Sequence, residues 1–134
     1  MIKKFIISID LGGTNLKVAL LDLKYNIEDK EVLSTRSFME KDQLTSGIVH
    51  SVTRYIKYNN LSKTEIMGVG LGLPGPIDSK NGVVHFFPNI PGWKDTPLKS
   101  CLETRLKLPV RVDNDASVMA LAIPPVIEKL AQRP

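Results

Sequence analysis

Hydrophobic residues in the first part of the chain follow two different periods. Residues 4–23 contain two apolar runs of strand character on either side of a Gly-Gly turn, which predicts a tight hairpin. A polar turn at 26–29 precedes a third expected strand over 30–38. In 42–58 the apolar residues recur at helical spacing. This part is therefore expected to be a three-stranded meander followed by a helix with one apolar face.

Further strands are expected in the second part. Residues 66–73 are apolar and glycine-rich, which is typical of a buried central strand. A long irregular loop over 78–95, with a small ribbon at 82–84, is expected to be functional because of its length. The alternation in 109–113 predicts another strand, and a final helix is expected from Ala116. Together the elements predict an α/β fold, in which helices cover a mixed sheet.

A short helix is expected over 97–106. Pro97 suits its first turn, and Asp95 or Thr96 could cap it. Cys101 belongs to its apolar stripe, so a buried thiol is expected. Because the chain has a single cysteine, an internal disulfide and a cysteine-rich zinc site are excluded.

Composition narrows the class of protein. The 134 residues fit one compact domain, and a content of 43% hydrophobic and 24% charged residues is typical of a globular protein. The net charge of +4 comes from dispersed Lys and Arg residues, so no nucleic-acid partner is expected. Every apolar run is too short to span a bilayer or to be a signal peptide, so we expect a cytoplasmic protein without a membrane partner.

The turn of the first hairpin is a candidate phosphate site. The backbone N–H groups of Gly12, Gly13 and Thr14 carry little side-chain bulk, so an anion could approach them closely. The carboxylate of Asp10 suits a divalent cation beside that anion. An ordinary hairpin turn explains the same residue types, and these residues alone leave both interpretations open.

Two more polar clusters follow expected strands, where ligands gather in sheets of this kind. Gly75 lies between two prolines after the buried strand, and Asn114 and Asp115 follow the last strand. Asp115 could accept a hydroxyl proton during phosphoryl transfer, while Asn114 could bind a polyol. The alternative is that the pair only caps the final helix.

The long loop contains a possible sugar contact. Asn89, flanked by prolines and close to an aromatic ring, suits a ligand that has hydroxyl groups and an apolar face. A stiff structural loop explains the same residues. For Trp93 we favour burial in the core.

Four segments resemble motifs of the ROK family (repressors, open reading frames and kinases), especially of its glucokinase-like sugar kinases. In chain order they are residues 9–19, 70–78, 87–93 and 108–116, and the resemblance covers residues 4 to 122. It implies one lobe of the ribonuclease H-like, actin-type ATPase fold. It also implies transfer of the γ-phosphoryl group of ATP to a sugar hydroxyl.

The resemblance assigns roles on the sugar side. It implies that Asp115 is the catalytic base and that Asn89 and Asn114 bind the sugar. Gly75 would lie against the sugar through its backbone.

On the phosphate side the resemblance implies ATP and magnesium as cofactors. Gly12, Gly13 and Thr14 would face the ATP phosphates, with Asp10 near the magnesium ion, directly or through water. Lys17 would be a supporting charge.

The sequence departs from the family pattern after residue 122. We expect residues 1–122 to be the N-terminal sugar kinase lobe and 123–134 to be an atypical tail, because Pro124 and Pro125 should break the final helix. The family's second lobe, with its adenosine pocket and Cys/His zinc site, is not matched. The lobe is therefore expected to be inactive alone and to form homo-oligomers through its exposed inter-lobe face.

A non-catalytic sugar-binding or regulatory module of the same family is the alternative. Regulators of the family carry a helix-turn-helix ahead of the first strand, and here that strand is expected within a few residues of Met1. The kinase lobe is therefore favoured.

Overall fold

The computed structural model describes residues 5–12, 15–24, 26–34, 41–86 and 92–114 of the 134. Eight strands, two α-helices and one 3-10 turn make up this part of the chain. In chain order they are β1 (Phe5–Leu11), β2 (Asn15–Asp22), β3 (Ile27–Ser34), α1 (Lys41–Tyr58), η2 (Lys63–Glu65), β4 (Ile66–Leu73), β5 (Ile77–Asp78), β6 (Val83–Phe86), β7 (Lys94–Thr96), α2 (Leu98–Leu106) and β8 (Val110–Asn114).

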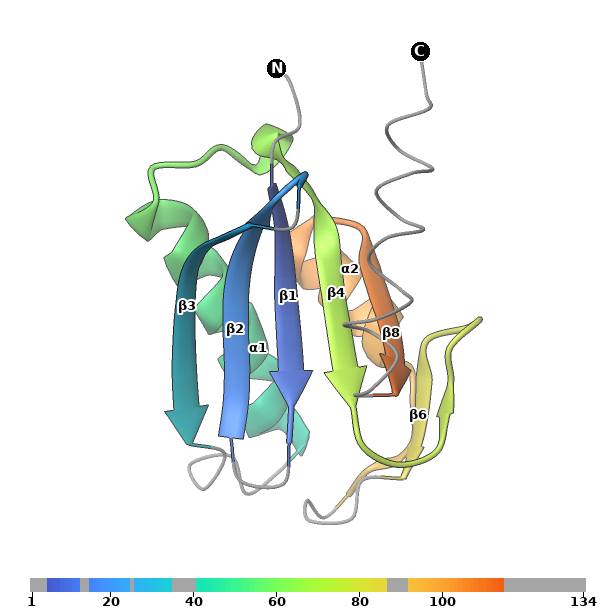
Figure 1. Cartoon of the computed structure of the whole chain (residues 1–134). Helices are drawn as coiled ribbons and strands as arrows, with labels where there is room; N and C mark the ends of the chain where they lie inside the picture. The colour runs from blue at the N-terminus through green and yellow to red at the C-terminus, as the bar shows by residue number, and fades with distance from the viewer. Residues whose placement is uncertain (1–4, 13–14, 25, 35–40, 87–91, 115–134) are drawn as a thin grey trace.

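Five strands form one mixed sheet in the order β3-β2-β1-β4-β8 (Figure 1). The first three are antiparallel neighbours, as the predicted meander requires. β4 then pairs parallel to β1, and β8 pairs parallel to β4. The mixed α/β sheet predicted from the sequence is confirmed. Its three parallel strands end at the same edge.

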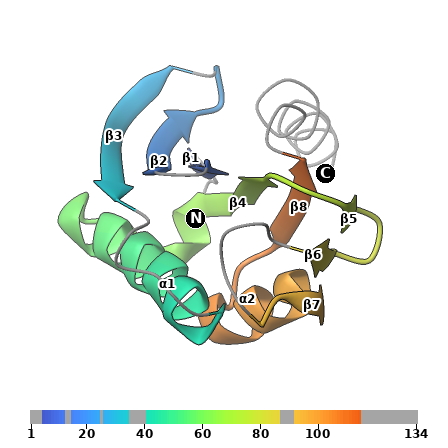
Figure 2. The ribbon, with the colours of Figure 1, turned by 90° about the horizontal axis from the view of Figure 1, so that it is seen from below.

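Helices α1 and α2 lie against the same face of the sheet (Figure 2). The main core fills the space between them and the sheet, and β4 is buried along its whole length. Alternate residues of β1 and β8 face this core, including Ile7, Ile9 and Val112. The helices have the lengths that their apolar periodicity predicts. No helix in the described part of the chain is long and apolar enough to cross a membrane.

A second, three-stranded sheet in the order β5-β6-β7 occupies the segment expected to be a mostly irregular loop. We call this sheet the ribbon. The strands are too short for periodicity to reveal them, and tertiary contacts hold them in place. Val84 and Trp93 are buried in the main core, and Trp93 is only 3% exposed, which confirms its predicted burial. Gly82 packs directly on Lys99 of α2, and the amide of Lys99 donates a hydrogen bond to its carbonyl at 3.1 Å.

Two predicted boundaries differ from the structure because local hydrogen bonds decide them. The third strand begins at Ile27, inside the expected polar turn, since Asp22 Oδ1 accepts from the amides of Lys24 and Asn26 and closes the turn early. The part of that expected strand beyond residue 34 lies outside the described residues. The last strand runs to Asn114, one residue further than expected.

Two predictions about α2 are wrong. Its N-cap is Pro97, which makes no side-chain hydrogen bond, because Thr96 belongs to β7 and the Asp95 carboxylate contacts His85. Cys101 is exposed and not buried. The buried stripe of the helix consists of Leu98, Leu102 and Leu106, four residues apart, so position 101 turns toward solvent.

Candidate functional site

Three of the polar clusters selected from the sequence lie at one edge of the sheet. Asp10 is beside Gly72 in the β1–β4 register, and Asn114 is beside Leu73 in the β4–β8 register. β1, β4 and β8 end at the same edge of the sheet (Figure 1), and Gly75 comes two residues after the end of β4. In open sheets of this kind, ligands bind just beyond that edge.

Strand pairing also aligns one residue from each of four neighbouring strands in a row across the sheet. Lys17 of β2 is opposite Asp10 of β1, followed by Gly72 of β4 and Asp113 of β8. Paired residues in neighbouring strands share a face, and this is the face opposite the main core. A cation on Lys17 and a carboxylate on Asp10 therefore occupy directly opposed cross-strand positions, which is a favourable arrangement.

The glycines at the edge have different roles. The amide of Gly12 donates to the carbonyl of Asn15 at 2.8 Å, so this N–H closes the hairpin and is not directed at a ligand. The N–H of Gly12 is therefore already used within the hairpin, and the predicted phosphate role of this residue is left to its small size. Gly75 has φ +95°, a conformation that side-chain-bearing residues rarely adopt. Its lack of a side chain is thus required by the turn after β4.

Asn114 is exposed at the end of β8. Its backbone amide donates to Oδ1 of Asp113 at 2.8 Å. Asp113 is a residue that the sequence reasoning did not select. The strand alternation was a usable signal, because burial of Val110 and Val112 turns Asp113 to the same face as Asp10.

Four candidate residues lie outside the described part of the chain. They are Gly13, Thr14, Asn89 and Asp115. Their roles, like the expected final helix, remain predictions.

The described carboxylates restrict how a metal could be held. Within the described ranges, no group of three or more His, Cys, Asp or Glu residues is arranged to hold a metal ion. Asp10, half-buried at the strand end, offers carboxylate oxygen, which suits magnesium. Magnesium is commonly bound by one or two carboxylates together with phosphate oxygens of a substrate. Asp10 therefore fits an ion that a phosphate ligand brings with it.

The sheet topology and the polar residues at its carboxyl edge define the fold class of the protein. A β3-β2-β1-β4-β8 mixed sheet, with helices on it and a glycine turn after β1, is the ribonuclease H-like, actin-type lobe expected from the sequence. The ROK family model matches residues 6–129, and the chain belongs to this family.

Curated relatives in this family include enzymes and regulators. A glucokinase from Halalkalibacterium halodurans is 37% identical over 121 residues, covering 90% of this chain and 36% of the relative. A xylose repressor from Caldicellulosiruptor bescii is 29% identical, covering 87% of this chain and 29% of the relative. The chain thus spans about a third of the length of these relatives.

Solved structures agree. The ROK hexokinase from Thermus thermophilus superposes with a TM-score of 0.74 at 31% identity, over 88% of this chain and 37% of that one. A ROK glucokinase from Streptomyces griseus, in complex with glucose and AMPPNP, has a TM-score of 0.66 at 30% identity, over 84% of this chain and 34% of that one. The chain is therefore similar in fold to about a third of each of these sugar kinases.

Proposed function

We propose that this chain is the N-terminal lobe of an ATP-dependent, glucokinase-like hexose kinase. The observation that supports this most strongly is the convergence of Asp10, Gly75 and Asn114 at the carboxyl edge of β1, β4 and β8. A glucokinase relative and a neighbour that holds glucose and an ATP analogue agree with it. We also propose that the protein works in the cytoplasm.

On the sugar side, Asp115 acts as the base. It accepts the proton of a sugar hydroxyl as that oxygen bonds to the γ-phosphorus and the bond to the β-phosphate oxygen breaks, leaving ADP. Asn114 and Asn89 orient the sugar hydroxyls, because an amide side chain both donates and accepts hydrogen bonds. Gly75 lets the sugar approach the backbone.

On the phosphate side, Gly12, Gly13 and Thr14 receive the ATP phosphates. Asp10 holds magnesium, directly or through water, and the ion neutralises charge on the phosphates when it is bound. Lys17 supports the same region with a positive charge opposite Asp10.

The lobe by itself should be inactive. Kinases of this architecture close two lobes around their substrates, which excludes water and aligns the transfer. We propose that residues 1–122 are one such lobe, that 123–134 are a tail, and that the inter-lobe face drives self-association. Purified chain should give no glucose 6-phosphate above background in a coupled assay, and sedimentation should detect oligomers.

Titration calorimetry with glucose tests the binding half of the proposal. The chain should bind glucose weakly, and Asn114→Ala should weaken binding roughly tenfold through loss of hydrogen bonds. Thr53→Ala, at an exposed position on α1, is the matched control and should not change the affinity. Absence of heat with glucose, both with and without magnesium ATP, would reject a preformed half-site.

A regulatory sugar-binding module is the second candidate, because a xylose repressor is among the relatives. Both candidates bind sugar, so phosphoryl transfer separates them. Combining the chain with a second lobe from a glucokinase relative should restore sugar phosphorylation that Asp115→Asn abolishes. Sugar binding without any restored transfer would favour the regulatory module.

A further inference from the structure

Three titratable residues share one face of the ribbon. Asp78 of β5 pairs with Val83 of β6, so the two share a face of the ribbon. His85 is two residues after Val83 on the same strand and therefore points to the same side. On the other flank Val84 pairs with Thr96 and Phe86 with Lys94, which puts His85 opposite Asp95. His85 thus lies on the central strand opposite Asp95 of β7, while Asp78 of β5 is on the same face, two positions further along β6 in the register.

The contact between His85 and Asp95 is short. Nδ1 of His85 is 2.7 Å from Oδ1 of Asp95, and the two side chains are 48% and 62% exposed. The backbone of Asp95 has φ +46°, a left-handed conformation within β7 that aspartate tolerates better than most residues. β7 therefore departs from regular strand geometry at the residue that contacts the imidazole.

The other charged groups around His85 have different partners. Both Asp78 oxygens accept hydrogen bonds from Asn81, which lower the Asp78 pKa most, and the charge of His85 lowers it further. On α2, the Lys99 ammonium donates to Glu103 at 3.2 Å. Lys94 lies opposite Phe86, one register position away from the His85–Asp95 pair. The two charged side chains that interact with the imidazole, Asp95 by direct contact and Asp78 through its charge, are both carboxylates.

The position of the pair matters for the proposed sugar contact. β6 ends at Phe86 and β7 begins at Lys94, so the pair lies next to the point where the chain leaves the ribbon for the connection that contains Asn89. The amide of residue 85 also donates to the carbonyl of Pro76 at 3.0 Å. The backbone of residue 85 thus contacts the segment before β5, and its imidazole contacts β7.

We propose that His85 is a positioning residue whose protonation tightens the ribbon. As an imidazolium paired with Asp95, and with Asp78 on the same face, it holds β6 against β7, the two strands that flank the connection containing Asn89 in the sequence. A charge-assisted hydrogen bond is roughly twice as strong as a neutral one, so the ribbon is held more firmly when His85 is charged. The consequence for hexose affinity rests on the proposed function.

Amide hydrogen exchange of the 134-residue chain tests, without any ligand, whether protonation of His85 tightens the ribbon. Histidines as a class titrate between about pH 5 and 8, so protection factors are compared at these limits after correction for intrinsic exchange. Protection of the β6 and β7 amides should fall about two- to fivefold at the higher pH, the size expected of an exposed ion pair.

Two variants and one control complete the test. His85→Gln and Asp95→Asn should each remove the pH dependence of ribbon protection, and asparagine tolerates the left-handed backbone at position 95. His50→Gln changes the only other histidine, which is exposed on α1, and should keep the dependence. A dependence that persists in both ribbon variants, or that is absent from the parent chain, would overturn the proposal.

Glucose titration at the same two pH values tests the positioning role. Affinity should be about two- to fivefold higher at the lower pH in the parent chain and in His50→Gln, and equal at both in His85→Gln. Equal affinity in the parent chain would overturn positioning of the sugar contact. If amide protection of the ribbon depends on pH as expected but the chain binds no hexose, the proposed function is rejected. The stabilisation of the ribbon by protonated His85 is then still supported.

Discussion

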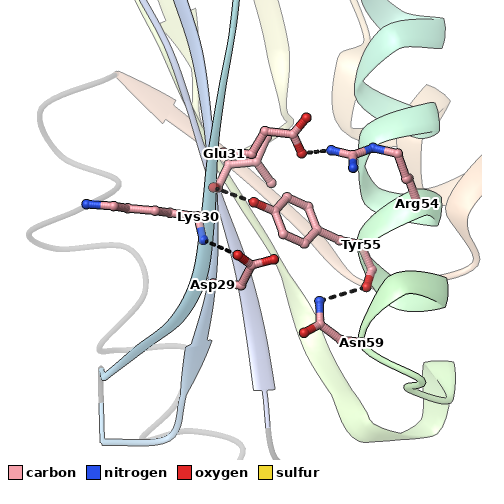
Figure 3. Close-up of polar contacts among 7 residues, drawn as sticks. Asp29, Lys30, Glu31, Arg54, Tyr55 and Asn59 are labelled. Atoms are coloured by element: carbon pink, nitrogen blue, oxygen red, sulfur yellow. Dashed lines mark hydrogen bonds and ion pairs between the residues drawn. The ribbon is translucent and has the colours of Figure 1, made fainter.

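The hydroxyl of Tyr55 on α1 donates a hydrogen bond to the backbone carbonyl of Val18 on β2, at 3.3 Å across 37 positions of sequence. The side chain is only 2% exposed. Arg54 beside it lies over the ring, 5.5 Å from the centroid, and makes an ion pair with Glu31 of β3 (Figure 3). These contacts join the helix to β2 and to the edge strand β3.

Tyr55→Phe should lower the free energy of unfolding by about 1 kcal/mol, because it deletes this hydrogen bond and keeps the packed ring. Urea denaturation of both chains measures the difference. Tyr58→Phe is the matched control, since that tyrosine is 73% exposed at the end of the same helix and should change the stability little. Equal stability of Tyr55→Phe and the parent would contradict a buried, bonded hydroxyl.

Stability should also fall at alkaline pH because of Tyr55. Burial, and then the negative charge of Asp29, raise the pKa of Tyr55 to about 12. An unfolded tyrosine titrates near pH 10, so between these values the unfolded chain loses a proton that the folded chain keeps. The contribution is complete below about pH 10 and is lost as the pH rises to about 12, by on the order of 2 kcal/mol.

Urea midpoints measured through this pH range check that prediction. Tyr55→Phe should show a shallower alkaline loss than the parent chain, because the titrating group is gone. A parallel loss in both chains would assign the effect to other groups.

Gly82→Ala should separate the ribbon from α2. Gly82 has φ +69°, and an added Cβ would lie 2.1 Å from Cβ of Lys99, so both strain and a clash are introduced. Such overpacking costs typically 1–3 kcal/mol, to be measured by urea denaturation. Gly92→Ala is the control, because its φ of +86° is similarly unfavourable while no atom lies within 4 Å of its added Cβ. Equal losses would attribute the whole effect to backbone strain.

Glu103→Ala should lower the free energy of unfolding by weakening the connection between α2 and β8. Its carboxylate accepts from the Val110 amide at 3.0 Å and from the Lys99 ammonium at 3.2 Å, joining α2 to the start of the strand that carries Asn114. Loss of a charged hydrogen bond costs about 1.5–3 kcal/mol. Glu103→Gln keeps an acceptor and should lose less, and the exposed Thr104→Ala should be nearly neutral in the same denaturation assay.

The elements predicted best are those that bury a continuous face. β4 has the predicted bounds 66–73, because a long apolar run with glycines has few alternatives to a central strand. The predicted end of α1 at Tyr58 is also confirmed. The small ribbon predicted at 82–84 overlaps only the start of β6, and β7 is not predicted, since four and three residues are too short for a period.

The site was predictable in its motifs and less so in its contacts. That polar residues follow β1, β4 and β8 can be read from the chain, but their meeting at one edge requires the parallel pairing of these strands. The placement of Asp113 in the row of Asp10, and the contact between His85 and Asp95, depend on strand register.

The sequence by itself determined the family motifs, the order of the main elements and the buried face of each, because hydrophobic period and glycine placement are local properties. Only the tertiary structure decided which strands are neighbours, that the segment after β4 folds as a ribbon on α2, and that Cys101 faces solvent. These features depend on register and on packing between distant segments, where a shift of one residue reverses which side chains are buried.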